Sequence, residues 1–233
     1  MKINGPLYKG LLISRPNRFL TIVDLNGKIQ KSHLPDPGRL EEILMPGAEV
    51  YLISAKNKSK RKTKYSTVMV NHNGQLISLV STLPNQFINE MLNKNGLPIF
   101  KHYNIISPEA AIENHRIDFL LENRNGSKFY LEVKSVTYVN RGIAKFPDAV
   151  TLRGTNHVKL LTKLKKDGIG TGIVFVCQRS DAELFTPMWE RDKTFCEALK
   201  HAKNSGVKIW CITLKIDLKE IKYFRQIPVM FNI

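Results

Sequence analysis

Cysteine is scarce in this 233-residue chain, which contains only Cys177, Cys196 and Cys211. An odd number of cysteines, each inside an apolar segment, argues against a disulfide framework and predicts reduced thiols in the core. The six histidines lack the spacing of zinc ligands and have no cysteine pair nearby, so a zinc site is not expected. The sequence therefore predicts a fold that depends on packing alone.

Long apolar runs are also missing, and none approaches the length needed to cross a membrane. The first residues do not form the pattern of a secretory signal peptide. No internal repeat or low-complexity segment is present. We therefore expect a globular protein in the cytoplasm.

Acidic residues are few, with 20 Asp and Glu against 36 Lys and Arg, which gives a net charge of +16. Such a positive field attracts polyanions, chiefly nucleic acid. A membrane partner is not expected, because there is no lipidation signal and no amphipathic basic helix. The charge does not distinguish DNA from RNA.

Residues 1–83 are predicted to form an OB-like β-barrel. Short apolar strands alternate with turn residues there, and Asn26-Gly27 and Asn73-Gly74 mark hairpins. A small all-β chain of this length usually closes into a barrel, which removes its exposed edges. One short helix is expected within this region, over residues 38–47.

Residues 84–233 show a different pattern, in which helices and strands alternate. Helices are predicted over 84–96, 156–168 and 192–206, with strands near 101–106, at 172–178 and over 207–216. A hairpin lies between the first and second helices, and residues 140–154 are expected to form a loop. Helix, three strands, helix, strand is the order of the restriction-endonuclease-like fold, an α/β domain with a mixed sheet.

The hairpin over 116–136 carries three charged residues between apolar ones. Glu132 and Lys134 share one face of their strand, because side chains alternate with a period of two. If residues 124–126 form a three-residue loop with Gly126 left-handed, residues whose numbers sum to 250 lie opposite each other, and Asp118 faces Glu132. A two-residue Asn125-Gly126 turn would instead pair Asp118 with Val133. Charges gathered on an apolar sheet favour a divalent cation or a ligand.

An aspartate followed by Glu-x-Lys on the next strand resembles the PD-(D/E)xK nuclease superfamily. The resemblance implies that Asp118 and Glu132 bind Mg²⁺, with Mn²⁺ as a substitute, and that Lys134 assists an attacking water. It also makes Glu90, on the preceding helix, a candidate metal ligand. Glu90 could equally be a solvated helix-face residue. Gln178 could position DNA or cap its strand, and Asp148 could enter the site from its loop.

Candidate DNA-binding residues are mostly basic. The loop over 56–64 contributes Lys58, Lys60, Arg61, Lys62 and Lys64, and such loops on OB-like barrels commonly follow a nucleic-acid backbone. Gly38-Arg39 at the start of the expected short helix could bind a phosphate, or serve as a rigid turn between the domains. Arg153 is a further candidate, and His157 starts a helix near it, where His157 could touch phosphate or cap the helix.

The segments HLPDPGRLEEILMPGAEVYL, FYLEVKSVTYV and AKFPDAVTLRGTNHVKLL occur in an order that resembles the sugar fermentation stimulation protein A family. The resemblance covers essentially the whole chain. It implies an N-terminal OB-like domain, a nuclease-like C-terminal domain and DNA binding. HLPDPGR departs from the HCPNTGR form of many members at Leu34, Asp36 and Pro37, which argues against a thiol or hydroxyl role there.

Two functions follow from these patterns. The first is a Mg²⁺-dependent DNA phosphodiesterase, which the intact Asp118, Glu132 and Lys134 favour. The second is a catalytically silent DNA-binding regulator of sugar (maltose) catabolism. An RNA-binding module shares the charge argument, whereas a helix-turn-helix reader over 192–206 is disfavoured because that helix lies between two strands. The sequence leaves the oligomeric state open.

Overall fold

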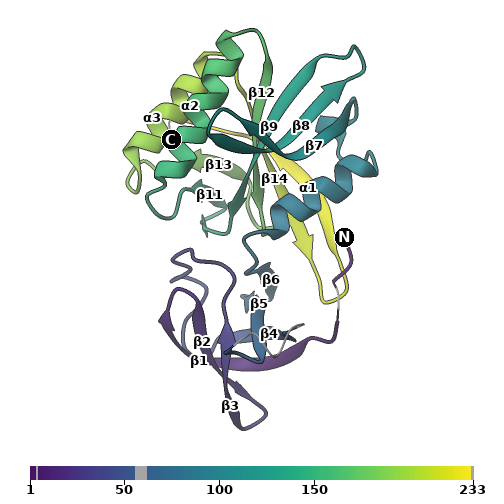
Figure 1. Cartoon of the computed structure of the whole chain (residues 1–233). Helices are drawn as coiled ribbons and strands as arrows, with labels where there is room; N and C mark the ends of the chain where they lie inside the picture. Colours follow the sequence, from purple (N-terminus) through teal and green to yellow (C-terminus); the bar gives the residue numbers. More distant parts are fainter. Residues whose placement is uncertain (4, 56–61, 232–233) are drawn as a thin grey trace.

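The computed structural model describes residues 1–3, 5–55 and 62–231. It forms two lobes, a small β-barrel and a larger domain in which helices cover a sheet (Figure 1). The three cysteines are buried and free, as predicted. Within the described ranges, no helix is long and apolar enough to cross a membrane.

The barrel is closed by five strands. They are β1 (Tyr8–Asn17), β2 (Leu20–Leu25), β3 (Lys28–His33), β4 (Glu49–Ser54) and β5 (Tyr65–His72), and β6 (Gln75–Ser78) extends β5 as a hairpin. The strands pair in the order β3-β2-β1-β4-β5, and a parallel pairing of β3 with β5 closes the ring. The closed ring confirms the predicted OB-like barrel. Both Asn-Gly hairpin turns are also present, with positive φ at each residue.

The expected helix over 38–47 is wrong. Only turns form there, over residues 41–43 and 46–47. Leu40 adopts a φ of 53°, a left-handed conformation that cannot continue a right-handed helix. Leu40, Ile43 and Leu44 are instead buried in the barrel core, so tertiary packing overrides the local helical pattern.

The second domain is built on a six-stranded sheet in the order β15-β14-β12-β9-β8-β7. Its strands are β7 (Tyr103–Ile112), β8 (His115–Asn123), β9 (Lys128–Val136), β12 (Gly170–Cys177), β14 (Lys208–Ile216) and β15 (Ile221–Ile227). β12 runs parallel to both β9 and β14, whereas the other pairs are antiparallel. This mixed sheet confirms the predicted restriction-endonuclease-like class.

Helices cover both faces of the sheet (Figure 1). α1 (Leu83–Asn93) packs on one face, while α2 (Leu152–Lys166) and α3 (Lys193–Asn204) pack on the other. The predicted apolar stripe of α2 is buried. α2 begins four residues earlier than predicted, because the Thr151 hydroxyl accepts the Gly154 N–H and caps the helix there.

Several short elements were not predicted from the sequence. A 3₁₀ turn, η2 (Pro98–Phe100), precedes β7. β10 (Val139–Asn140), β11 (Ile143–Phe146) and β13 (Leu184–Pro187) form a small sheet beside α3. β11 lies inside residues 140–154, which were expected to form a loop, and no element was predicted for residues 184–187. Strand β15 was also missed. These strands are short or polar, so their own sequences carry little strand signal.

The first residues of the chain pair with the second domain before the barrel begins. Lys2 bridges to Glu220 in antiparallel fashion, and the Ile3 N–H donates to the Lys219 carbonyl at 2.9 Å. The Ile221 N–H donates to the Met1 carbonyl at 2.8 Å. The barrel is therefore held to the second domain at residues 1–3 and again where β6 leads into α1.

Candidate active site

The β8–β9 hairpin has the register that its loop chemistry predicts. Gly126 is left-handed, with a φ of 75°, and the Asn123 N–H donates to the Ser127 carbonyl at 3.0 Å across a three-residue loop. The paired residues run from Glu122 with Lys128 to Phe119 with Leu131. Each pair sums to 250, which confirms the predicted register and brings Asp118 to the end of the ladder, beside Glu132.

Asp118 lies where β8 and β9 separate. Its Oδ2 accepts the Val133 N–H at 2.7 Å, and its Oδ1 accepts Nδ2 of Asn85, on the first turn of α1, at 2.6 Å. Burial, with the charge of Glu132 as the second cause, raises the pKa of Asp118 to about 6, although the Val133 N–H opposes the shift. A single carboxylate thus joins two strands and a helix.

Glu132 is almost completely buried, with 3 % of its surface exposed. Its Oε1 lies 2.6 Å from His157 Nδ1 and also pairs with the Lys134 ammonium. Burial alone would raise the pKa of Glu132, but the hydrogen bond from His157 and the Lys134 charge outweigh it, so the pKa lies below its usual range. Glu132 is therefore held in its charged form.

The second oxygen of Glu132 has no such support. Oε2 is buried and has no hydrogen-bond partner among the described residues. A buried carboxylate oxygen without a partner is costly, and a hard cation would satisfy it. Two carboxylates suffice for Mg²⁺, which keeps several waters, so the residues present fit a divalent cation. Among the described residues, no group of three or more His, Cys, Asp or Glu is arranged to hold a metal ion, and His157 is engaged with Oε1 of Glu132.

Glu90 does not join the cluster. Its carboxylate accepts from Lys94 at 2.7 Å and lies 3.7 Å from the Met1 amino group. Glu90 follows Asn85 by five positions, which rotates it about 140° around the helix. The face of α1 that meets Asp118 carries Asn85 instead, so the prediction of Glu90 as a metal ligand does not fit this structure.

Gln178 is fully buried and cannot touch DNA as placed. Its Nε2 donates to Ser135 Oγ at 2.9 Å and to the Val80 carbonyl at 3.4 Å. The alternative role, in which Gln178 secures the strand end, fits these contacts. The amide ties β9 to the segment that connects the barrel to α1.

Of the two roles predicted for Gly38-Arg39, the structure fits the rigid turn between the domains and does not fit the phosphate site. The Gly38 N–H donates to Asp36 Oδ1 at 2.8 Å, and the Arg39 N–H donates to Asp148 Oδ2 at 3.0 Å. Both amides are engaged by carboxylates, so they do not form a phosphate site at a helix start. Asp148 comes from the second domain, and it therefore contacts the barrel instead of entering the Asp118–Glu132 cluster. The Arg39 side chain is exposed.

The remaining basic candidates are dispersed. Lys62 and Lys64 are exposed beside the start of β5, whereas Lys58, Lys60 and Arg61 lie outside the described residues. Arg153 is exposed and lines a cavity of about 530 Å³ together with Arg116 and His157. The structure thus brings together Asp118, Glu132 and Lys134, and places the basic residues around more than one surface.

Asn85 and His157 contact the cluster directly, and neither was assigned that role from the sequence. Asn85 marked only the start of a helix, and His157 was considered for phosphate contact or capping. Both residues lie on helices that are distant in sequence from the strands they contact: Asn85 is 33 residues from Asp118, and His157 is 25 residues from Glu132. No spacing rule in the sequence would have found them.

A five-stranded OB barrel joined to a mixed α/β domain, with Asp, Glu and Lys at the parting of two strands, defines a two-domain protein with a restriction-endonuclease-like core. Comparison with family models agrees. Residues 13–79 match the SfsA N-terminal OB domain, and residues 82–220 match the sugar fermentation stimulation protein RE domain. The chain belongs to the sugar fermentation stimulation protein family.

Individual relatives match over nearly their whole length. A sugar fermentation stimulation protein homolog of Clostridium tetani is 40 % identical over 99 % of this chain and 100 % of its own. A homolog of Clostridium botulinum is 43 % identical over 98 % of this chain and 99 % of its own. The structure of Pyrococcus furiosus SfsA in complex with Ca²⁺ superimposes with a TM-score of 0.90 at 28 % identity, covering 99 % and 98 % of the two chains.

Proposed function

We propose that this protein is a DNA phosphodiesterase that depends on Mg²⁺ or Mn²⁺. The observation that carries the proposal is the buried Glu132 Oε2, which has no partner among the described residues and lies in a cluster with Asp118 and Lys134. Ca²⁺, which is bound in the Pyrococcus furiosus relative, prefers oxygen ligands as Mg²⁺ does, and this supports a cation at such carboxylates. The net charge of +16 supports a nucleic-acid substrate.

Each residue of the cluster has a role that its contacts suggest. Asp118 and Glu132 would hold the cation, which when bound polarises a phosphodiester oxygen and lowers the pKa of a water. Val133 N–H and Asn85 keep the Asp118 carboxylate in one orientation, and His157 does the same for Glu132. Lys134, with 13 % of its side chain exposed, would orient the attacking water and neutralise the charge that develops on the phosphate.

One observation favours the alternative of a DNA-binding regulator that does not cleave. The Lys134 ammonium is paired with Glu132, so it is already engaged and is not free to contact a water or a phosphate. If this pair persists when DNA is bound, the protein would bind DNA, and could regulate sugar (maltose) catabolism, without hydrolysing it.

A cleavage panel separates the two functions. The protein is incubated with end-labelled duplex, single-stranded, nicked and branched DNA, and with RNA, in Mg²⁺, Mn²⁺ or EDTA. We expect cation-dependent cleavage of at least one DNA form. Asp118→Ala and Lys134→Ala should lower the rate about a hundredfold or more while binding survives. Lys134→Arg should not restore activity, because the larger planar guanidinium does not place its charge where the compact Lys134 ammonium lies.

Arg124→Ala is the matched control, since Arg124 is exposed in the loop at the other end of the same hairpin. It should cleave as the unaltered protein does. If no DNA form is cut under any condition while DNA is still bound, the regulator is the correct function. If only RNA is cut, the substrate class is RNA and not DNA.

A further inference from the structure

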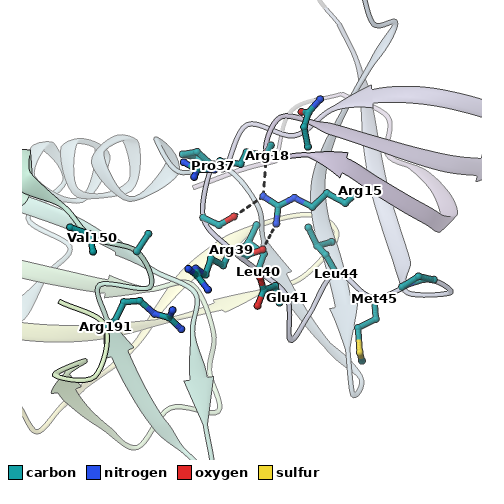
Figure 2. Close-up of a pocket in the computed structure, with 14 residues that line it drawn as sticks. Arg15, Arg18, Pro37, Arg39, Leu40, Glu41, Leu44, Met45, Val150 and Arg191 are labelled. Atoms are coloured by element: carbon teal, nitrogen blue, oxygen red, sulfur yellow. Dashed lines mark hydrogen bonds between the residues drawn. The ribbon is translucent and has the colours of Figure 1, made fainter.

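A cavity of about 830 Å³ lies between the barrel and the second domain, apart from the Asp118–Glu132 cluster. Arg15, Arg18 and Arg39 line it from the barrel, and Arg191 lines it from the second domain. Figure 2 shows Arg39 and Arg191 facing each other from the two domains across this space. Four cations thus converge on one cavity.

These arginines have no carboxylate at ion-pair distance among the described residues, although the charges of Asp36, Glu41 and Asp148 act on Arg15. Glu41 is the one acidic residue in the described lining. Asp36 and Asp148 lie behind it and accept backbone amides instead. The lining therefore favours an anion.

Arg15 is fixed by the backbone, and both Arg15 and Arg191 are incompletely bonded. Arg15 donates to the carbonyls of Gly38 at 2.6 Å, Arg18 at 3.2 Å, and Arg39. Its Nε is buried without a partner among the described residues, and so is the Nε of Arg191. A guanidinium held by backbone carbonyls is pre-organised, and its remaining donors match the oxygens of a phosphate.

The rest of the lining is apolar, which a bare ion would not need. Leu40, Leu44, Met45 and Val150 contribute to it, and Met45 and Val150 are 56 % and 76 % exposed. Exposed apolar side chains beside arginines suit the sugar and base of a nucleotide. The volume lies within the roughly 300–1,000 Å³ of small-ligand sites, so a nucleotide fits where a duplex cannot enter.

The cavity adjoins the end of β9. A second cavity, of about 190 Å³, shares Pro37 and Gly38 with the first, and its wall includes Ser135 and Thr137. Ser135 directly follows Lys134. The second cavity therefore lies one residue along β9 from the cluster, although Ser135 and Lys134 point to opposite faces of the strand.

We propose that this interdomain cavity anchors a single DNA strand, with a phosphate on Arg39 and Arg191 and the adjoining nucleoside against Met45 and Val150. The proposal rests on the proposed function, and it names the substrate of that site as DNA with a single-stranded portion. A free mononucleotide presents the same phosphate, sugar and base, so the experiment must distinguish binding of a free nucleotide from binding of a DNA strand.

Binding of a fluorescein-labelled oligothymidylate and of a duplex of equal length is measured by fluorescence anisotropy in EDTA, at several salt concentrations. The Arg39→Ala/Arg191→Ala double variant should bind the single strand at least tenfold more weakly. Its log–log salt slope should fall by about 0.7 for each phosphate that the variant no longer neutralises. Arg124→Ala should change neither quantity by a comparable amount, and thermal melting of each variant checks the fold.

The outcomes separate the cavity from the proposed catalysis. If the double variant binds the single strand as Arg124→Ala does, or loses only duplex binding, the cavity proposal is overturned even if cleavage is found. Displacement of the oligothymidylate by micromolar dTMP would assign the cavity to a free nucleotide and also overturn it. If the double variant weakens single-strand binding but no DNA is ever cleaved, the cavity proposal stands and the nuclease fails.

Discussion

His157 Nδ1 lies 2.6 Å from Oε1 of Glu132, and both side chains are buried. The histidine comes from α2 and the glutamate from β9, so the contact joins a helix to the centre of the sheet. His115 packs edge-on against the His157 ring, with centroids 5.8 Å apart. The imidazole is thus fixed on two sides, and it fixes the carboxylate in turn.

Replacing His157 with Gln should shift the acid limb of the cleavage profile to higher pH. The hydrogen bond from His157 lowers the pKa of Glu132, so its weakening lets that pKa rise. We also expect a roughly 10–100-fold lower rate, as for other residues that orient a metal ligand. The pH–rate profile is the measurement, and His201→Gln, on the exposed face of α3, is the control. An acid limb that stays in place would contradict this role.

Asp118→Asn should gain stability relative to the unaltered protein as pH rises. In the absence of divalent cations the folded-state pKa of about 6 lies above the unfolded value near 3.8, so the folded state binds the proton more tightly. The stability that Asp118 contributes is present below about pH 4 and is lost as pH rises through 6. The difference amounts to on the order of 3 kcal/mol.

Urea denaturation in EDTA at pH 4.5 and pH 8 measures this change in Asp118→Asn and the unaltered protein. Other groups titrate in both proteins, so the difference between their unfolding free energies isolates Asp118. An equal difference at the two pH values would show that Asp118 titrates normally.

Divalent cations should raise the melting temperature of the unaltered protein. At a cation concentration a hundred times its dissociation constant the stabilisation is about 2.7 kcal/mol, which corresponds to several degrees. Glu132→Gln and Asp118→Asn should show no shift relative to their own cation-free melting points, because each lacks one of the two carboxylates. Arg124→Ala should retain the shift. A shift that persists in both carboxylate variants would place the cation elsewhere.

Gly38→Ala should weaken the contact between the domains. A Cβ at residue 38 would lie 2.6 Å from Asp148 Oδ2 and 3.0 Å from Asp36 Oδ1. Asp148 must then move away from the Arg39 N–H that it accepts, and we expect a loss of about 1–3 kcal/mol of unfolding free energy.

Asp148→Asn is the comparison for that variant. It keeps an acceptor oxygen for Arg39 and removes the negative charge that raises the pKa of Asp36, so it should cost less than Gly38→Ala. Chemical denaturation of both proteins tests this order, and a Gly38→Ala protein as stable as the unaltered one would refute the argument.

The position of Asp118 beside Glu132 could be predicted because it depends on local chemistry. Alternation fixes which residues of a strand share a face, and a left-handed Gly126 fixes the loop length. Closure of the barrel also followed from the number and length of its strands. In each case the residues that decide the outcome lie within one hairpin or one run of short strands.

The rotation of the helices around the cluster could not be predicted from the sequence in the same way. Whether α1 presents Asn85 or Glu90 to Asp118 depends on the rotation of a packed helix, which the apolar residues Phe87 and Ile88 set through the core. His157 likewise reaches Glu132 through the packing of α2 on the sheet. The helix expected to start at Gly38-Arg39 does not form, because Leu40 is buried in the barrel. Gln178 is likewise buried inside the protein.

The pairing of residues 1–3 with β15 has a mechanical consequence. The polypeptide enters the barrel from the edge of the large sheet and returns from β6 to α1 at another point of the same domain (Figure 1). A lobe fastened at two points cannot swing freely on a single linker. The hydrogen bond from the Arg39 N–H to Asp148 is a further contact between the lobes, so a rocking motion that widened the arginine-lined gap would have to break it.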